Sequence, residues 1–279
     1  MKAPLDDALD LTTLAKGLDH AEGVCWDPVR RCLWAGGEDG QIYSLDLAGT
    51  LTMKYRIEGG MLLGLALDAS GALYVCDPGN HTVWRYDHEN APTRYGPFIN
   101  YPNYASFAPD GTLYVSDSGS FVVATGSIVA ISPDGSSRVL DLPPVDFANG
   151  LSVYEGYLYY VASALPGVWR VSIAEGANVG EPELVTALSR CVPDGLAFDN
   201  AGSLYISCYQ PNQVWRLTSG ELDLIIDDWT GEFILSPTNI AFYGDELDRL
   251  ALVSLCGHSL TSVNVAATGE PILRPAIKE

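Results

Sequence analysis

Basic residues are scarce in this sequence. Its 279 residues include 15 Lys and Arg against 35 Asp and Glu, which gives a formal net charge of −20 at pH 7. Binding to a nucleic-acid backbone needs a patch or stripe of Lys and Arg, and the few basic residues here are dispersed along the chain. The composition therefore argues against a nucleic-acid partner.

Long apolar runs are absent as well. A membrane-spanning helix needs about 20 consecutive apolar residues, and no run in the sequence approaches this length. The opening MKAPLDDALDLTTLAKG has three aspartates and no apolar segment, whereas a secretory signal has a cationic start and an apolar centre. We expect no membrane association and a cytoplasmic location.

Several short motifs are also missing. None of the six cysteines forms a CxxC pair, so we expect buried free thiols that pack as small hydrophobic side chains. A disulfide between Cys25 and Cys32 across one hairpin is the alternative. The sequence contains no GxSxG, GxGxxG or GxxxxGKS/T, so it supports neither a serine hydrolase nor a phosphate-binding loop.

The main positive feature is an internal repeat. Six segments share an apolar run, a tight turn and a second β-rich run, and they begin at His20, Met61, Tyr101, Phe147, Val192 and Ser236. Two further strand-like runs follow in most copies, and four strands in a repeat of this length are typical of one propeller blade. The sequence predicts an all-β, six-bladed β-propeller, with residues 1–279 as a single domain. Residues 11–17 (LTTLAKG) and 271–277 (PILRPAI) are the candidates for strands that close the ring.

One position of the repeat is predicted to line the central channel. It holds, in blade order, Glu22, Leu63, Asn103, Asn149, Asp194 and Asn239. Five of the six carry a side-chain oxygen, and two carboxylates facing each other across a channel repel unless a cation lies between them. Oxygen donors without Cys or His favour a hard divalent ion, with Ca²⁺ expected and Mg²⁺, Mn²⁺ and Zn²⁺ as alternatives.

The same geometry predicts the rim of the pocket. The loops that follow the second strand of each blade should surround the channel residues, because antiparallel neighbours end where the first strand begins. The longest of them, residues 116–127 (SDSGSFVVATGS), is the candidate lid or specificity loop. His81 and His258 are the histidines expected on this face, and His88 is expected far from it.

The motifs at the channel position resemble those of a known family. The sequence is similar to the senescence marker protein, gluconolactonase and luciferin-regenerating enzyme family of six-bladed propellers in four motifs, Ala21-Glu22-Gly23, Pro102-Asn103, Ala148-Asn149-Gly150-Leu151 and Pro193-Asp194-Gly195-Leu196. The resemblance extends over essentially the whole chain. It implies that Glu22, Asn149 and Asp194 bind one divalent metal, that Asn103 contacts substrate or a metal-bound water, and that the activity is lactone hydrolysis.

The third blade departs from that pattern. Sugar-lactone members of the family commonly have Arg-Pro-Asn-Asp, whereas this chain has Tyr101-Pro102-Asn103-Tyr104. The loss of the cation and the gain of two tyrosines suggest a flatter or less polar substrate than a glucono-lactone, with Tyr101 and Asn103 orienting it. Asp194 is the expected general base, with direct nucleophilic attack by its carboxylate as the competing version.

Two other functions stay open at this point. A calcium-dependent propeller hydrolase similar to diisopropyl fluorophosphatase or paraoxonase would act on phosphotriesters or esters. A non-enzymatic propeller would bind a ligand and keep the metal for stability. The expected partner is a small-molecule lactone, and the sequence does not indicate an oligomeric state.

Overall fold

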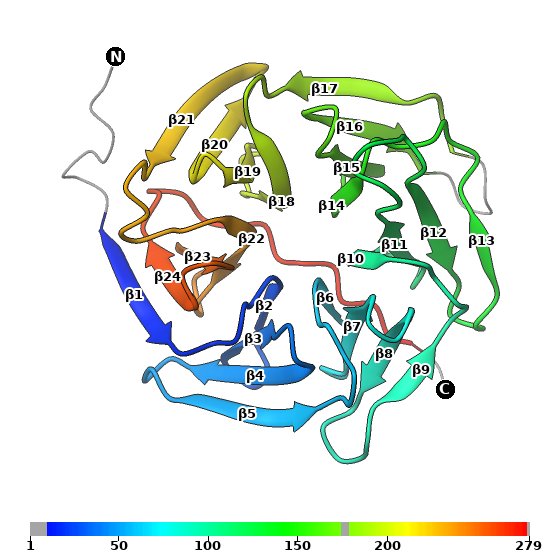
Figure 1. The fold of residues 1–279 in the computed structure, drawn as a ribbon, viewed down its shortest axis with the longest axis horizontal. Coiled ribbons are helices and arrows are strands. Elements are labelled where there is room, and N and C mark those ends of the chain that lie inside the picture. Colours follow the sequence, from blue (N-terminus) through cyan, green and yellow to red (C-terminus); the bar gives the residue numbers. More distant parts are fainter. Residues whose placement is uncertain (1–9, 174–178, 278–279) are drawn as a thin grey trace.

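Strands make up the regular structure of this chain. The structure, a computed structural model, describes residues 10–173 and 179–277, and no helix occurs in these two ranges. Accordingly, these ranges contain no helical segment long and apolar enough to cross a membrane. Six four-stranded antiparallel sheets surround a central axis, as Figure 1 shows. The predicted six-bladed β-propeller is confirmed.

The blades follow one another along the chain, and strands that are consecutive in sequence pair in each sheet. The first three blades consist of β2 (Val24–Asp27), β3 (Cys32–Gly36), β4 (Gln41–Asp46) and β5 (Leu51–Arg56); β6 (Leu65–Leu67), β7 (Leu73–Asp77), β8 (Thr82–Tyr86) and β9 (Thr93–Tyr95); and β10 (Pro102–Phe107), β11 (Leu113–Asp117), β12 (Ser127–Ile131) and β13 (Ser137–Val139).

The next two blades repeat this order. They consist of β14 (Ala148–Tyr154), β15 (Tyr157–Ala162), β16 (Gly167–Ser172) and β17 (Glu183–Ala187); and β18 (Val192–Phe198), β19 (Leu204–Gln210), β20 (Gln213–Thr218) and β21 (Glu221–Asp227). The sixth sheet contains β22 (Pro237–Tyr243), β23 (Arg249–Ser254), β24 (Ser259–Val263) and, from the other end of the chain, β1 (Leu11–Lys16).

Local turn chemistry explains why the inner strands form hairpins. Between β6 and β7, Asp68 Oδ1 accepts hydrogen bonds from the backbone N–H groups of Ser70 (2.9 Å) and Ala72 (3.0 Å). Gly71 has a φ of +81°, a conformation that favours glycine. An aspartate that binds its own downstream backbone is a standard means of forming a tight turn. Asp199 does the same in the fifth blade, accepting from Ser203 N–H at 2.7 Å.

Apolar side chains pack between blades. Among the described residues, six clusters of buried hydrophobic side chains each join two neighbouring blades. The second strands are therefore covered on both faces: every residue of β7 is buried, whereas the outer β5 is largely exposed. This burial explains the nearly continuous apolar runs of the inner strands, which do not alternate as a half-exposed strand would.

The first of the two predicted closing segments is confirmed. β1 pairs antiparallel with β24, with Leu11 opposite Val263 and Lys16 opposite Ser259. The sixth blade thus takes its outer strand from residues 11–16, which join residues 259–263 in one sheet.

The prediction for residues 271–277 is wrong. This segment forms no strand; the red trace in Figure 1 crosses the central axis. Residues 271–274 line a cavity together with Trp26, Phe107 and Phe198, which lie at the ends of inner strands away from the predicted metal site. The N–H of Ala69 donates to Pro275 O at 2.9 Å, and the N–H of Glu270 donates to Phe198 O at 2.9 Å. The outer position of the last blade is already filled by β1, and Pro271 and Pro275 have no N–H to give to a ladder.

The cysteines behave as small buried side chains. All six are free thiols; five are buried and Cys256 is exposed. In the first hairpin Cys25 lies opposite Trp34 and Cys32 lies opposite Asp27, so the two thiols are not paired across the strands. The alternative of a hairpin disulfide is therefore wrong.

Candidate active site on the propeller axis

The inner strands bring the predicted channel residues to one level of the propeller. Figure 1 shows β2, β6, β10, β14, β18 and β22 nearest the axis, and each channel residue lies within two residues of the start of one of them. In the first five blades the repeat phase read from the sequence is thus a position in space. The six positions nevertheless differ in what their side chains do.

The carboxylates of Glu22 and Asp194 interact electrostatically. Burial raises the pKa of Glu22 to about 7, and the nearby Glu38 carboxylate adds to the rise. Burial raises the pKa of Asp194 well above its usual range, the charge of Glu22 adds to it, and a hydrogen bond from the Asn149 side chain opposes it. Two carboxylates so close and so poorly hydrated favour a cation between them.

Asn149 completes this group. Its side chain is only 4% exposed, and its Nδ2 donates to Ser163 Oγ at 3.2 Å. Its Oδ1 is buried and has no hydrogen-bond partner among the described residues. A buried acceptor left without a partner costs about 1–3 kcal/mol. An unpartnered amide oxygen beside two carboxylates fits a hard divalent cation.

A series of hydroxyl groups, which the sequence reading missed, orients this ring. Ser163 Oγ accepts from Asn149 and donates to Pro193 O at 2.7 Å, the carbonyl just before Asp194. Ser118 makes the corresponding bonds in the third blade: it accepts from Asn103 Nδ2 at 3.0 Å and donates to Ala148 O at 2.8 Å. Each serine thereby ties a channel amide to the next blade.

The series continues around the ring. Ser207 Oγ donates to Thr238 O at 2.9 Å, and Thr238 Oγ1 donates to Glu22 O at 2.9 Å. Ser118 and Ser163 directly follow the second strands of their blades, at equivalent positions, whereas Ser207 lies within β19 and corresponds to Ser116. The recurrence of Ser118 and Ser163 at one repeat position was the signal that could have identified these two.

Two of the six predicted channel residues offer no free oxygen, and the one in the sixth blade is also out of register. Pro237 lies opposite Ser254 and Ile240 opposite Leu252, as Pro193 lies opposite Cys208 and Leu196 opposite Ile206 in the fifth blade. Thr238 is therefore the counterpart of Asp194, and the assignment of Asn239 to this repeat position is wrong.

Asn239 Oδ1 accepts a hydrogen bond of 2.8 Å from the hydroxyl of Tyr104, and Leu63 is apolar and 2% exposed. Tyr104 itself is buried, and burial raises the pKa of its phenol above the usual range. The sixth-blade amide therefore binds a neighbouring side chain across the channel.

Tyr101 lies on the rim of the same pocket. Burial raises the pKa of its phenol, and the carboxylates of Glu22 and Glu38 add to the rise, which places Tyr101 beside them. Its backbone carbonyl accepts from the N–H of Ser118 at 3.0 Å, at the start of the predicted lid loop. That loop joins β11 to β12 and exposes three apolar side chains, those of Phe121, Val122 and Val123.

The histidines need one correction. His258 lies at the β23–β24 turn and His81 at the β7–β8 turn, as expected, and His88 lies at the opposite end, with its Nε2 2.6 Å from Gly71 O. His20 is also on the channel-rim side, where its ring packs edge-on against His258 at a centroid distance of 4.3 Å. It was missed because it lies outside the strands, in the segment between β1 and β2.

The sequence matches the model of a known protein family. Residues 98–255 match the family model described as the SMP-30/gluconolactonase/LRE-like region. No curated protein matches the sequence significantly.

Solved structures share the fold at low identity. A gluconolactonase from Xanthomonas campestris is 23% identical, with a TM-score of 0.77 over 94% of this chain and 91% of that one. The calcium-binding protein regucalcin from Agrobacterium tumefaciens is 17% identical, with a TM-score of 0.80 over 96% and 97%. Because the family model covers more than half of the sequence, the chain belongs to the SMP-30/gluconolactonase/LRE-like family.

Proposed function

We propose that this protein is a metal-dependent lactonase that opens the ring of a small lactone at the channel site. The observation that carries the proposal is the group formed by the half-buried carboxylates of Glu22 and Asp194 and the buried, unpartnered Oδ1 of Asn149. Membership of a family named after a gluconolactonase, and the fold shared with a gluconolactonase structure, support lactone chemistry at this place.

Glu22, Asn149 and Asp194 are the residues that would hold the metal. Three oxygen donors of this kind favour Ca²⁺, with Zn²⁺, Mn²⁺ and Mg²⁺ as alternatives. The calcium-binding protein among the structural neighbours is consistent with this choice. When bound, the cation supplies a Lewis acid that polarises the lactone carbonyl and stabilises the oxyanion formed from it.

Asp194 is the general base of the proposed reaction. Its carboxylate takes a proton from water as the water oxygen bonds to the carbonyl carbon. The ring C–O bond then breaks, and the proton passes to the departing alkoxide, so that the product is a hydroxy acid. Attack by the Asp194 carboxylate itself is the competing version.

Tyr101 and Asn103 orient the substrate in this proposal. Asn103 is held by Ser118, and Tyr101 lies beside the carboxylates. A phenol in place of a guanidinium, and the apolar tip of the loop between β11 and β12, favour a lactone with a less polar ring or substituent than a sugar acid. The expected preference is for aliphatic or aromatic lactones over glucono-lactone.

The test combines metal content with a lactone panel followed by acid release in a pH-stat. We expect one divalent ion per chain by elemental analysis, and acid release that depends on it. Glu22→Gln and Asp194→Asn should each lower kcat/KM by at least about a hundredfold, the lower end of what general base catalysis contributes. The exposed Glu89 provides a matched control, because Glu89→Gln removes a charge without touching the channel.

The outcome that contradicts the proposal is specific. Full lactonase activity in the Asp194→Asn protein, or in protein stripped of metal, would exclude the mechanism. The panel should also include phosphotriesters and aryl esters. Turnover of those substrates alone would indicate a phosphotriesterase or arylesterase, and metal binding without any turnover would indicate a ligand-binding propeller.

A further inference from the structure

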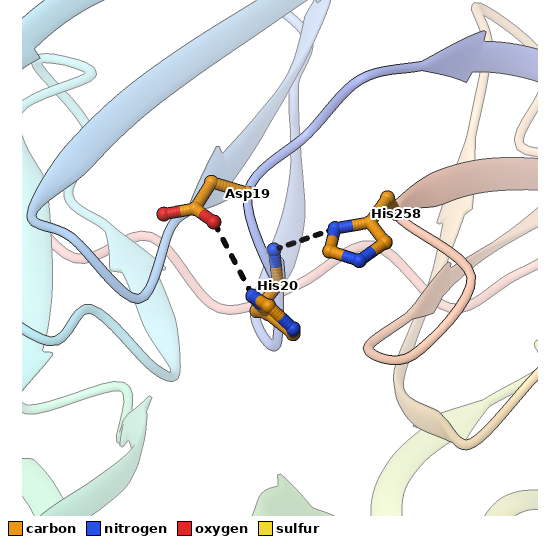
Figure 2. A group of neighbouring side chains, drawn as sticks. All are labelled: Asp19, His20 and His258. Atoms are coloured by element: carbon orange, nitrogen blue, oxygen red, sulfur yellow. Dashed lines mark hydrogen bonds and ion pairs between the residues drawn. The ribbon is translucent and has the colours of Figure 1, made fainter.

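Four ionisable side chains form a second group at the mouth of the channel. We call Asp19, His20, Glu38 and His258 the rim cluster. Asp19 and His20 lie between β1 and β2, Glu38 lies in the β3–β4 turn and His258 in the β23–β24 turn. The donor atoms of Asp19, His20 and His258 all lie within 4.8 Å of one another. Figure 2 shows the two rings and the carboxylate converging from opposite ends of the chain.

Hydrogen bonds to one of its oxygens, Oδ2, hold the Asp19 carboxylate in place. Asp19 Oδ2 accepts from the N–H of Asp39 at 3.2 Å and from Gln41 Nε2 at 3.1 Å. Its other oxygen, Oδ1, lies 3.2 Å from His20 Nδ1. Carboxylates that bind metals are commonly fixed in this way, with the oxygen that does not bind the ion hydrogen-bonded to neighbouring groups.

His258 is oriented by the backbone. Its Nδ1 lies 3.1 Å from Leu18 O, so this nitrogen carries the proton and donates it to the carbonyl. The N–H of His20 lies 3.5 Å from the same nitrogen, at the outer limit of a hydrogen bond, so the carbonyl contact decides the tautomer. The Nε2 atom of His258 is then left unprotonated, which is the form that binds metals.

The spacing of the donors matches a small four-coordinate ion. Ligands at about 2.0–2.2 Å from a tetrahedral metal are roughly 3.3–3.6 Å apart. His20 Nδ1 lies 3.2 Å from Asp19 Oδ1 and 3.3 Å from Glu38 Oε2. Glu38 is exposed and can turn inward without disturbing packing, while His258 keeps its bond to Leu18 O.

We propose that the rim cluster is a second metal site, which takes a first-row divalent cation of the zinc class. Imidazole together with carboxylate favours Zn²⁺ over Ca²⁺, whereas the channel site offers oxygen donors alone. The two sites therefore differ in the class of ion they select. The proposal concerns metal binding and does not depend on the lactonase activity.

Zinc binding in the presence of saturating calcium tests the proposal. Metal-stripped protein is titrated with Zn²⁺ by calorimetry, and bound metal is measured by elemental analysis after gel filtration. We expect one zinc per chain in addition to calcium. His258→Gln and Glu38→Gln should each weaken zinc binding by about tenfold or more, with calcium stoichiometry unchanged.

The chain offers a closely matched control. His81 is exposed and immediately precedes β8, as His258 immediately precedes β24 in its own blade, so His81→Gln should leave zinc binding unchanged. Cobalt(II) in place of zinc gives an independent readout. The absorption spectrum of the bound cobalt should differ from that of the wild-type protein in His258→Gln and should match it in His81→Gln.

Two results would overturn the proposal. One is the absence of zinc binding by the wild-type protein in the presence of calcium. The other is zinc binding of unchanged affinity in a folded His258→Gln/Glu38→Gln double variant. This outcome includes zinc binding that is lost only when Glu22→Gln and Asp194→Asn are introduced, which would indicate that the zinc occupies the channel site.

Discussion

At the scale of single residues, hydrogen-bond partners decide which members of the channel ring can bind a cation. Asn149 and Asn239 have the same side-chain chemistry and lie near the starts of inner strands, but they hold successive positions of the repeat. Tyr104 takes the Oδ1 of Asn239, whereas the Oδ1 of Asn149 stays unpartnered and its Nδ2 is held by Ser163. The difference between two chemically identical side chains thus rests on their repeat position and on their hydrogen-bond partners.

Ser163 provides the sharpest test at this scale. Replacing it with alanine leaves both Asn149 Nδ2 and Pro193 O without their partner, so Ser163→Ala should lower the free energy of unfolding by about 1–3 kcal/mol. It should also weaken metal binding at the channel, because Asn149 loses its fixed orientation. Urea denaturation and metal titration measure the two effects.

Ser254 is the matched control. It ends the second strand of the sixth blade and is fully buried, but its Oγ has no hydrogen-bond partner within the described part of the chain. Ser254→Ala therefore removes an unsatisfied hydroxyl and should be nearly neutral or slightly stabilising. Equal losses of stability in the two variants would contradict the role assigned to Ser163.

At the scale of elements, β1 decides whether the ring is closed. It is the outer strand of the sixth blade, and it is the only strand formed by residues 10–23. Without it, β24 would present an open row of N–H and C=O groups, which invites association with other chains.

Strand complementation tests this closure. A chain that starts at residue 18 should unfold at a lower temperature and aggregate more readily than the full sequence. A synthetic peptide of residues 10–17 should restore part of the lost stability by adding to the edge of β24. A peptide of the same composition in scrambled order is the control; equal rescue by both peptides, or none by either, would argue against this role of β1.

At the scale of the whole molecule, the placement of charge matters more than its amount. Most of the 35 acidic residues serve turns or lie at the surface, but Glu22 and Asp194 meet on the axis. In metal-free protein their repulsion opposes folding, and a bound cation reverses this effect. The same substitution should therefore have opposite effects with and without metal.

Thermal unfolding checks this reversal. Calcium at about a hundred times its Kd should stabilise the wild-type protein by about 2.7 kcal/mol, which is roughly 5–10 °C for a chain of this size. Glu22→Gln should raise the melting temperature of the metal-free protein and abolish most of the response to calcium. A Glu22→Gln protein that is less stable than wild type without metal and still responds fully to calcium would contradict the proposed site.

Some statements about the whole molecule stay predictions. These are the treatment of residues 1–279 as one domain, the cytoplasmic location and the roles of Tyr101 and Asn103 toward a substrate.

Much of this protein is determined by its sequence alone, because a propeller is built from local pairings. Strands adjacent in the chain pair within one blade, so a repeat of turns and apolar runs specifies six blades and places Glu22, Asn149 and Asp194 at one level. The pairing of residues 11–16 with the last blade could also be inferred, since an incomplete blade needs an outer strand.

The tertiary structure decided what depends on contacts between distant segments. The sequence alone placed Asn239 at the repeat position of Asn149, whereas the strand register places it one residue later, where Tyr104, 135 residues away in the chain, is its partner. His20 and His258 are 238 residues apart and meet only because the ring closes. The path of residues 271–277 across the channel likewise follows from β1 already filling the place where they were expected. Closing the ring creates these contacts, and a periodic pattern carries no record of them.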